Sequence, residues 1–409
     1  MSQNTFYELI PSVQYYDWGS TDDQSSIRTF LKKKHSHFLT EKPIAEVWKG
    51  AHPKNPSHLK DIHDSSRTYN FYQLIQENPS HVLGEDLSFK KEFPFLLKIL
   101  EAEKPLSIQS HPDKKTAIIL HKKDPANYPD SNHKPEIAIS LGDFEALCGF
   151  RPHEELLNFF YQYPTKELWD QKSEFSLKRI YANLMNADKQ KLVALTEEFL
   201  SFLSEASPDP IRDQWFIKLY QTFGKDDPGI YSIYLLNYYH LKENEALFLP
   251  PNTPHAYLRG SIVECMTNSD NVIRAGLTSK FKDIPTLLAT LDYEKKRISP
   301  LRPKKTNNIS KFYQIPIEEF YLELIHSSDQ DFDKTLFYHL KFFPSIITIL
   351  RGNVKVIMNQ KEWSFHEGQI LFFPGDLKHQ EIILIFSSEA WAFLATTLLN
   401  QKTKESLEL

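Results

Sequence analysis

Two residues of the chain, Gln109 and His111, have side chains that can bind a metal, and their spacing suits a strand. They lie in the segment PLSIQSHPDK, which follows a nearly continuous apolar run and is predicted to form a strand. Successive strand side chains point to opposite faces, so residues two apart share one face and can converge on one point. Pro112 ends the strand and leaves His111 near its end. Alone, this spacing is more typical of a hydrogen-bonded strand than of a metal site.

Two more candidate ligands stand where later strands begin. Glu136 opens the apolar run EIAISL, and the preceding proline restricts Lys134 to extended geometry, which puts Lys134 and Glu136 on one face. His255 follows three prolines in PPNTPHAY, where the restricted backbone makes a stiff turn. Each is more often structural when taken alone. Together with Gln109 and His111 they form a nitrogen and oxygen set with one carboxylate, which suits zinc with a position left open for water or substrate.

Short strands separated by turns dominate the first third of the chain and must position these residues. FPFLLKIL (93–100) is a nearly continuous apolar run, and EIAISL (136–141) alternates before a Gly–Asp turn. Strands of this length and spacing predict a β-sandwich or barrel.

The pattern then becomes helical, because Leu192, Leu195 and Phe199 recur at steps of three and four. The turn-forming stretch GKDDPG (224–229) ends this pattern, and strand-like runs return at 230–241. We therefore expect a helical insertion of three to five helices in an otherwise β-rich chain. The polar segment SPLRPKKTNNIS predicts a linker before a second, smaller β-roll. The first predicted unit is a β-domain in two parts, 1–150 and 226–305. A helical insertion, 151–225, separates these parts, and a C-terminal β-roll, 306–409, follows them.

The composition is that of an ordinary globular protein. The 409 residues are 41% hydrophobic and 25% charged, and the net charge is −5. This balance argues against disorder and against a nucleic-acid partner, so an anionic substrate needs a local basic pocket. The two cysteines, Cys148 and Cys265, are too few for a disulfide framework and are predicted to be buried thiols. No secretory signal or membrane-spanning stretch is evident, so we expect a cytoplasmic protein with no membrane partner.

Long strings of the sequence resemble type I mannose-6-phosphate isomerases. Their order and spacing match that family over roughly residues 1–155 and 230–290. The C-terminal roll matches in layout more than in motif. The matching strings are YDWGS (16–20), AEVWKGAHPKNPS (45–57), PFLLKILEAEKPLSIQSHPDK (94–114), NHKPEIAISLGDFEALCGFRP (132–152) and YLRGSIVECMTNSDNVIRAGLTSKFKD (257–283).

The resemblance implies a mainly β fold of cupin-type jelly rolls, catalytic and C-terminal, with an inserted α-helical domain. It implies one zinc ion per chain, with the four candidate ligands at the family's ligand positions. Arg274 matches the position of the active-site arginine. Two residues depart from the pattern, because Lys49 replaces an apolar residue and Ser279 replaces a proline. We expect these departures to affect only loop structure.

The implied reaction interconverts mannose 6-phosphate and fructose 6-phosphate through an enediol or enediolate. It needs ring opening, a base, and stabilisation of negative charge on the former carbonyl oxygen. Arg274 stays protonated and is expected to bind an oxyanion or phosphate rather than to act as the base. The other catalytic candidates in the matched strings are Glu264, Lys134, His133, Asp270 and Tyr257, among which the sequence does not identify a base.

Three further residues are candidates for binding the substrate. Lys98 interrupts the apolar FLLKIL run, and with Lys134, Arg274 and Lys280 it can form the basic pocket that a phosphate needs. Trp18 is a candidate wall of the sugar site, although packing in the core is the stronger expectation for a tryptophan.

Two other classes of function remain open at this point. One is a metal-dependent cupin oxygenase, in which two histidines and a carboxylate bind iron, and the other is a sugar-binding cupin without turnover. The resemblance favours the isomerase, with a small sugar phosphate as the only partner of a monomer, in mannose metabolism or GDP-mannose supply. The histidines of the C-terminal roll lack a paired ligand spacing, so no metal is expected there.

Overall fold

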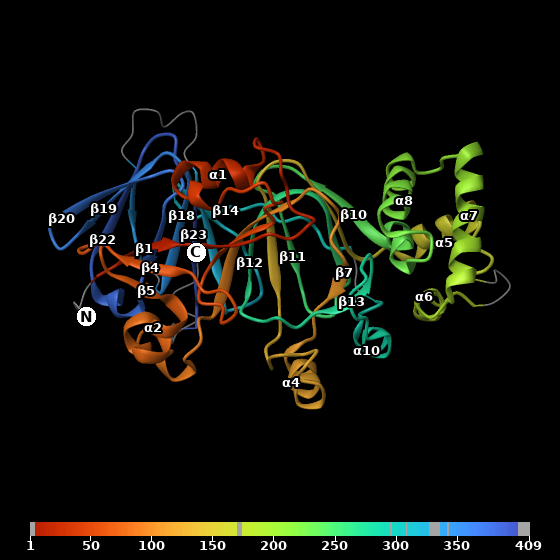
Figure 1. Cartoon of the computed structure of the whole chain (residues 1–409), viewed down its shortest axis with the longest axis horizontal. Helices are drawn as coiled ribbons and strands as arrows, with labels where there is room; N and C mark the ends of the chain where they lie inside the picture. The colour runs from red at the N-terminus through yellow and green to blue at the C-terminus, as the bar shows by residue number, and fades with distance from the viewer. Residues whose placement is uncertain are drawn as a thin grey trace.

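We describe the protein from a computed structural model that covers residues 5–169, 174–294, 297–307, 309–326, 336–341 and 343–399. Two β-rich parts lie side by side, and a group of helices lies at one end, beyond the first part (Figure 1). This is the mainly β architecture with a helical insertion that the sequence predicts. No helix in the described residues is both long and apolar enough to cross a lipid bilayer.

The first part is built around β12 (His255–Thr267), a long strand whose side chains form much of the site. It belongs to a sheet of ten strands, and most residues of these strands are buried. The main path runs β10-β9-β12-β6-β3-β2, and β7, β8, β11 and β13 branch from it. The other nine strands are β2 (Ser12–Gln14), β3 (Glu46–Lys49), β6 (Phe95–Ala102), β7 (Ile108–Ser110), β8 (Glu136–Ser140), β9 (Phe144–Phe150), β10 (Leu236–Leu241), β11 (Ala246–Leu249) and β13 (Ile273–Gly276).

Strand register determines which side chains of this sheet face the site and which face the hydrophobic core. Glu264 of β12 pairs with Lys98 of β6, and Lys98 pairs with Trp48 of β3, so these three form one row across three strands. The residues directly before and after these three in each strand face the opposite side of the sheet, because side chains alternate along a strand. Cys265 and Lys49 belong to such a row, which faces the hydrophobic core rather than the site.

Lys49 corrects one expectation from the sequence. It lies in strand β3, not in a loop, and its side chain is fully buried. Its Nζ atom has no hydrogen-bond partner in the described part of the chain and lies 5.9 Å from the ring centroid of Phe30. Burial lowers the pKa of this amine to about 7.

The second β-rich part contains strands from both ends of the chain. One of its sheets has the order β14-β15-β16-β23-β18-β21-β1-β4-β5, and the other has the order β17-β22-β19-β20. Tyr7 of β1 pairs with Phe372 of β21, more than 360 residues away. The strands are β1 (Tyr7–Ile10), β4 (His58–Asp61), β5 (Thr68–Asn70), β14 (Lys304–Lys305), β15 (Ser310–Phe312), β16 (Tyr321–His326), β17 (Leu336–His339), β18 (Ser345–Arg351), β19 (Asn353–Met358), β20 (Lys361–His366), β21 (Ile370–Phe373), β22 (Ile382–Phe386) and β23 (Trp391–Thr396).

This pairing corrects two of the predicted boundaries. The span 1–150 does not belong to one roll, because β1, β4 and β5 join the sheet of the C-terminal strands. The predicted linker at about 300–310 is part of the fold, since it contains β14 and Leu301 bridges to Ala246. Both differences are long-range strand pairings, which leave no periodic signal in the sequence.

The helical insertion lies between β9 and β10 and packs its own apolar faces together. It contains α5 (His153–Gln162), α6 (Leu177–Met185), α7 (Lys189–Glu205) and α8 (Pro210–Phe223). Glu145 of β9 accepts a hydrogen bond of 2.6 Å from Trp215 Nε1 of α8, which ties the insertion to the sheet. Figure 1 shows these helices beyond β10.

Shorter helices connect the strands. Several begin with a side-chain cap, as at Asp113, whose carboxylate accepts from Thr116 N at the start of α4. They are α1 (Ser26–Lys34), α2 (Phe71–Glu77), α3 (Pro79–Leu83), α4 (Lys114–Lys123), α9 (Ser232–Leu235) and α10 (Ile284–Thr290), with 3₁₀ turns η1 (Ser36–Phe38), η2 (Ser88–Lys90), η3 (Pro228–Tyr231) and η5 (Gly375–His379). Both cysteines are buried free thiols, as predicted.

Candidate metal centre and adjoining cavity

Three of the four predicted metal ligands converge in the structure. Nε2 of His111 and Nε2 of His255 each lie 3.4 Å from Oε2 of Glu136. The side chains come from the end of β7, the first residue of β12 and the first residue of β8, and all three are buried. Among the described residues, no other group of three His, Cys, Asp or Glu side chains converges in this way.

Hydrogen bonds fix the orientation of both imidazoles. Nδ1 of His111 lies 2.8 Å from the carbonyl oxygen of Asn271, and Nδ1 of His255 lies 2.9 Å from that of Thr253. A carbonyl oxygen only accepts, so each Nδ1 carries the proton and each Nε2 presents a lone pair. Neither Nε2 atom, nor Oε2 of Glu136, has a hydrogen-bond partner in the described residues.

The protonation states also suit a metal. Burial lowers the pKa of His111 to about 4, so the ring is neutral at pH 7. Burial opposes ionisation of Glu136, but His111 and Lys134 beside it outweigh this effect and hold its pKa well below the ordinary value. Two imidazoles and a carboxylate, each oriented by a second hydrogen bond or an ion pair, form a donor set that fits zinc.

Gln109 lies next to this group. It is in β7, where it pairs with His255 on one side and with Arg274 on the other. Its side chain and that of Glu136 line a cavity of about 1030 Å³. Strand β7 ends at Ser110, so His111 lies between the strand and Pro112, and the role of Gln109 as a fourth ligand stays a prediction.

A buried network of charges forms one wall of the cavity. Nζ of Lys98 lies 2.7 Å from Oε2 of Glu264 and 3.6 Å from Oε1 of Glu46. The Tyr257 hydroxyl donates to Oε1 of Glu264 at 2.7 Å. Burial raises the pKa of Glu264 above its ordinary value, and Lys98 opposes this rise. Lys98 is thus buried in an ion pair on a central strand, and it does not extend to solvent from a sheet edge.

Asp270 lies in a different electrostatic environment. Its carboxylate is 2.6 Å from Nζ of Lys54 and 3.3 Å from Nε2 of His52. Burial works against the charge, but these two partners hold the pKa of Asp270 far below its usual range. Asp270 therefore stays ionised at any working pH and is a weaker proton acceptor than Glu264.

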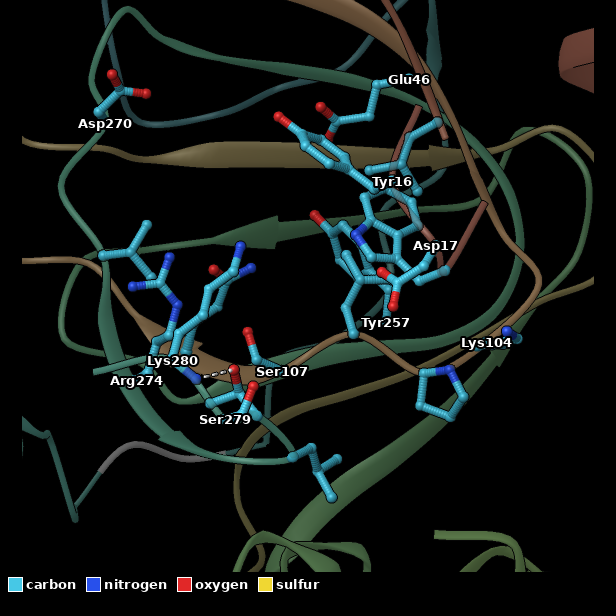
Figure 2. Close-up of a pocket in the computed structure, with 18 of the residues that line it drawn as sticks. Tyr16, Asp17, Glu46, Lys104, Ser107, Tyr257, Asp270, Arg274, Ser279 and Lys280 are labelled. Carbon is cyan, nitrogen blue, oxygen red and sulfur yellow. Dashed lines mark hydrogen bonds between the residues drawn. The ribbon is translucent and has the colours of Figure 1, made fainter. Parts of the chain in front are cut away.

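Arg274 and Lys280 differ from Lys98, Lys134 and Lys54, three other cations that line the cavity. Within the described part of the chain, neither has an ion pair, whereas Lys98, Lys134 and Lys54 each pair with a carboxylate. Partial burial alone lowers the pKa of Arg274. Figure 2 shows Arg274 and Lys280 at the same side of the pocket as Ser107 and Ser279. This side can bind an anion.

Some residues of the site were not predicted from the sequence. Glu46, His52 and Lys54 line the cavity and form ion pairs with predicted residues. Ser107 also lines the cavity wall. Glu46 and Trp48 of EVWK are two residues apart and therefore share one face of the strand. This spacing is the signal in the sequence that could have indicated Glu46. Trp18 lines the cavity, although core packing is the stronger expectation, and its ring stacks on Tyr16 at 5.6 Å between centroids.

His133 is a correction to the predicted site. It does not line the cavity, and its Nε2 lies 2.8 Å from Oε1 of Glu319, in the second β-rich part. The imidazole lowers the pKa of Glu319 to about 2. Lys134 and Glu136 share the cavity face, so the alternation of extended backbone turns His133 away.

Comparisons with known proteins agree with this arrangement. A sequence model of the family described as "Phosphomannose isomerase type I, catalytic domain" matches residues 6–153. The mannose-6-phosphate isomerase of Saccharomyces cerevisiae is 34% identical over 422 residues, which cover 92% of this chain and 96% of the yeast protein. The human mannose-6-phosphate isomerase is 36% identical over 350 residues, which cover 78% and 82%.

A solved structure gives the same result for the fold. The mannose 6-phosphate isomerase of Salmonella typhimurium, in a crystal structure bound to its substrate fructose 6-phosphate and to zinc, superposes with a TM-score of 0.80. The two sequences are 28% identical, and the match covers 97% of this chain and all of the Salmonella chain.

Proposed function

This chain belongs to the type I phosphomannose isomerase family, and we propose from that premise that it interconverts mannose 6-phosphate and fructose 6-phosphate with one zinc ion. The observation that carries the proposal is the position of the three unpartnered ligand atoms beside a cavity that also contains an unpaired guanidinium. The alternatives, a cupin oxygenase and a sugar-binding cupin without turnover, are not favoured, because the relatives are isomerases.

The proposed ligands of the zinc are Gln109, His111, Glu136 and His255. Bound there, zinc supplies Lewis-acid stabilisation of negative charge on a sugar oxygen. The cavity has room for a hexose phosphate beside this group, and Trp18 and Tyr257 provide walls of low polarity.

Glu264 is our choice for the residue that accepts the proton from carbon. Burial raises the pKa of Glu264 above its ordinary value, whereas the pKa of Asp270 is strongly lowered, and the carboxylate with the higher pKa is the stronger base. Tyr257 and Lys98 hold the two oxygens of Glu264 in place. Asp270 is better suited to accept hydrogen bonds from sugar hydroxyls.

Arg274 and Lys280 are the proposed ligands of the phosphate. Both cations are free of carboxylates among the described residues, and guanidinium presents forked donors that match phosphate oxygens. Ser107 and Ser279 lie on the same side of the cavity and add hydroxyl donors.

A coupled assay tests the activity directly. The purified, zinc-loaded protein should form fructose 6-phosphate from mannose 6-phosphate, and Glu264→Gln should lower kcat by about 10²-fold or more while zinc stays bound. No product from the wild-type protein, or consumption of oxygen with ferrous iron, would reject the proposal. We further propose a cytoplasmic monomer, which sedimentation velocity tests for the oligomeric state.

A further inference from the structure

A single carboxylate joins the end of the helical insertion to the loop that carries Ser279 and Lys280. Oδ1 of Asp227 accepts hydrogen bonds from Gly229 N at 2.7 Å and from Leu277 N at 2.9 Å. Its Oδ2 accepts from Thr278 N at 3.3 Å. Three backbone donors from two distant segments thus converge on one buried side chain.

The loop needs this support because its backbone is unusual. Leu277 follows the end of β13 and has φ of 55°, in the left-handed region that residues with a side chain rarely adopt. Its amide and the next one point towards Asp227, away from any strand ladder. A carboxylate that accepts both amides stabilises this turn against the ordinary extended alternative.

Two glycines allow the segments to approach this closely. A Cβ atom added to Gly276 would lie 2.5 Å from Cα of Gly229, and one added to Gly229 would lie 2.6 Å from Leu277 N. Both distances are shorter than any real contact, so only glycine fits on each side. The GKDDPG stretch, which in the sequence only marks the end of the helices, is therefore the contact between the insertion and the loop.

The loop leads directly to the proposed phosphate ligands. Arg274 precedes Gly276 by two residues in β13, and Thr278, Ser279 and Lys280 follow Leu277 along the cavity wall. A change in the turn at Leu277 therefore changes the position of Ser279 and Lys280.

We propose that Asp227 is a positioning residue for the loop 277–280, and that the helical insertion sets the affinity for the phosphate end of the substrate through this residue. The inference rests on the proposed function, because it takes Lys280 to be a phosphate ligand. Asp227 itself uses its charge on three amides and acts through the loop, without touching the reacting carbons.

The test uses Asp227→Ala and Asp227→Asn in the full-length, zinc-loaded protein. We expect KM for mannose 6-phosphate and the inhibition constant of inorganic phosphate to rise about tenfold or more in Asp227→Ala, with kcat within about threefold of wild type, since phosphate binding is shared by ground and transition states. Asp227→Asn keeps one acceptor and should show a smaller rise. Zinc content should not change.

Hydrogen exchange gives a readout that does not depend on turnover. The amides of Leu277 and Thr278 should exchange faster in both variants. Glu197→Gln is the matched control, because it removes a carboxylate from the same insertion, where Glu197 is exposed and pairs with Lys225 at 3.0 Å. It should leave KM and exchange unchanged.

The outcomes separate the two proposals. Unchanged KM and phosphate inhibition in Asp227→Ala overturn the inference, as does a fall in kcat or zinc content with KM unchanged. If Asp227→Ala does not fold, the same criteria apply to Asp227→Asn. Faster exchange in the Asp227 variants, combined with no isomerase activity in the wild-type protein, would reject the proposed function instead.

Discussion

Arg274 and Lys98 are both cations of one cavity, but their surroundings prepare them for different tasks. Lys98 is neutralised by Glu264 and Glu46, so its charge holds the protein's own carboxylates in place. Arg274 has no such partner among the described residues and is available to an anion. Because Arg274 is unpaired among the described residues and Lys98 is not, we expect Arg274 to bind the anionic group of the substrate.

Arg274 can be tested by replacement with alanine. We expect kcat/KM to fall by about 10²–10³-fold, the scale of losing one donor to an oxyanion, while zinc content and Tm stay near wild type. Arg274→Lys should restore only part of the rate, since it keeps the charge and loses the fork. Near-normal kinetics in the alanine variant would end this assignment, and loss of zinc or stability would make Arg274 structural.

Lys49 predicts a dependence of stability on pH. Its folded pKa, about 7, lies below the value in the unfolded chain, so between pH 7 and pH 10 the unfolded state binds more protons. The contribution of Lys49 to the free energy of unfolding of the wild-type protein therefore becomes more favourable as the pH rises over this range. Lys49→Met, of similar volume, should raise the free energy of unfolding at pH 7 by about 2–4 kcal/mol, and by less at pH 9.5.

Chemical denaturation at the two pH values measures this difference. Lys191→Met is the control, because Lys191 lies on the surface of α7 with 73% of its side chain exposed. It should change stability little at either pH. If Lys49→Met raised the free energy of unfolding equally at pH 7 and pH 9.5, this would contradict the lowered pKa of the buried amine.

At the scale of elements, three strand ends build the metal centre. β7 brings His111, β8 begins with Glu136 and β12 begins with His255, and Gln109 of β7 pairs directly with His255. Hydrogen bonds donated by the two rings to the backbone carbonyl oxygens of Asn271 and Thr253 fix their orientation. The site is thus held by sheet pairing together with two backbone carbonyls of the adjoining loops.

Removal of one ligand tests this arrangement. His255→Ala should lose stoichiometric zinc after dialysis against a mild chelator, since three ligands no longer converge. His366→Ala, at an exposed histidine of β20 that contacts Asn353, should keep its zinc. Elemental analysis of both variants decides the point, and a fully loaded His255→Ala protein would remove this residue from the ligand set.

At the scale of the whole molecule, the two β-rich parts are one folding unit. β1, β4 and β5 complete the sheet of the C-terminal strands, and one hydrophobic cluster contains Ile139 of the first part and Phe372 of the second. The C-terminal strands therefore cover apolar surface and strand edges that would otherwise face water.

A chain shortened to residues 1–305 tests this dependence. Without β21, strand β1 keeps β4 but loses its other partner, and the shared cluster opens, so the shortened protein should be insoluble or aggregated. Size-exclusion chromatography against the full-length protein measures the difference. A soluble, monomeric and active product of 1–305 would show that the first part folds on its own.

The sequence by itself determined the local features of this protein. The two-residue spacing of Gln109 and His111, the start of a strand at Glu136 and the helical period after residue 151 are all encoded within a few neighbouring residues. The matched strings then identified the family and the β-rich fold. These features could be predicted because strand alternation, proline restriction and helical periodicity act between residues that are close in the chain.

Only the tertiary structure decided which residues meet. The pairing of Lys98 with Glu264, the turn of His133 away from the cavity towards Glu319, the support of Leu277 by Asp227 and the insertion of β1 beside β21 join segments 50 to more than 360 residues apart. Such contacts depend on strand register and on the packing of one layer against another, and a shift of one residue reverses every side chain. The sequence leaves these alternatives open because they differ in long-range pairing, whose energy is settled only when the whole chain packs.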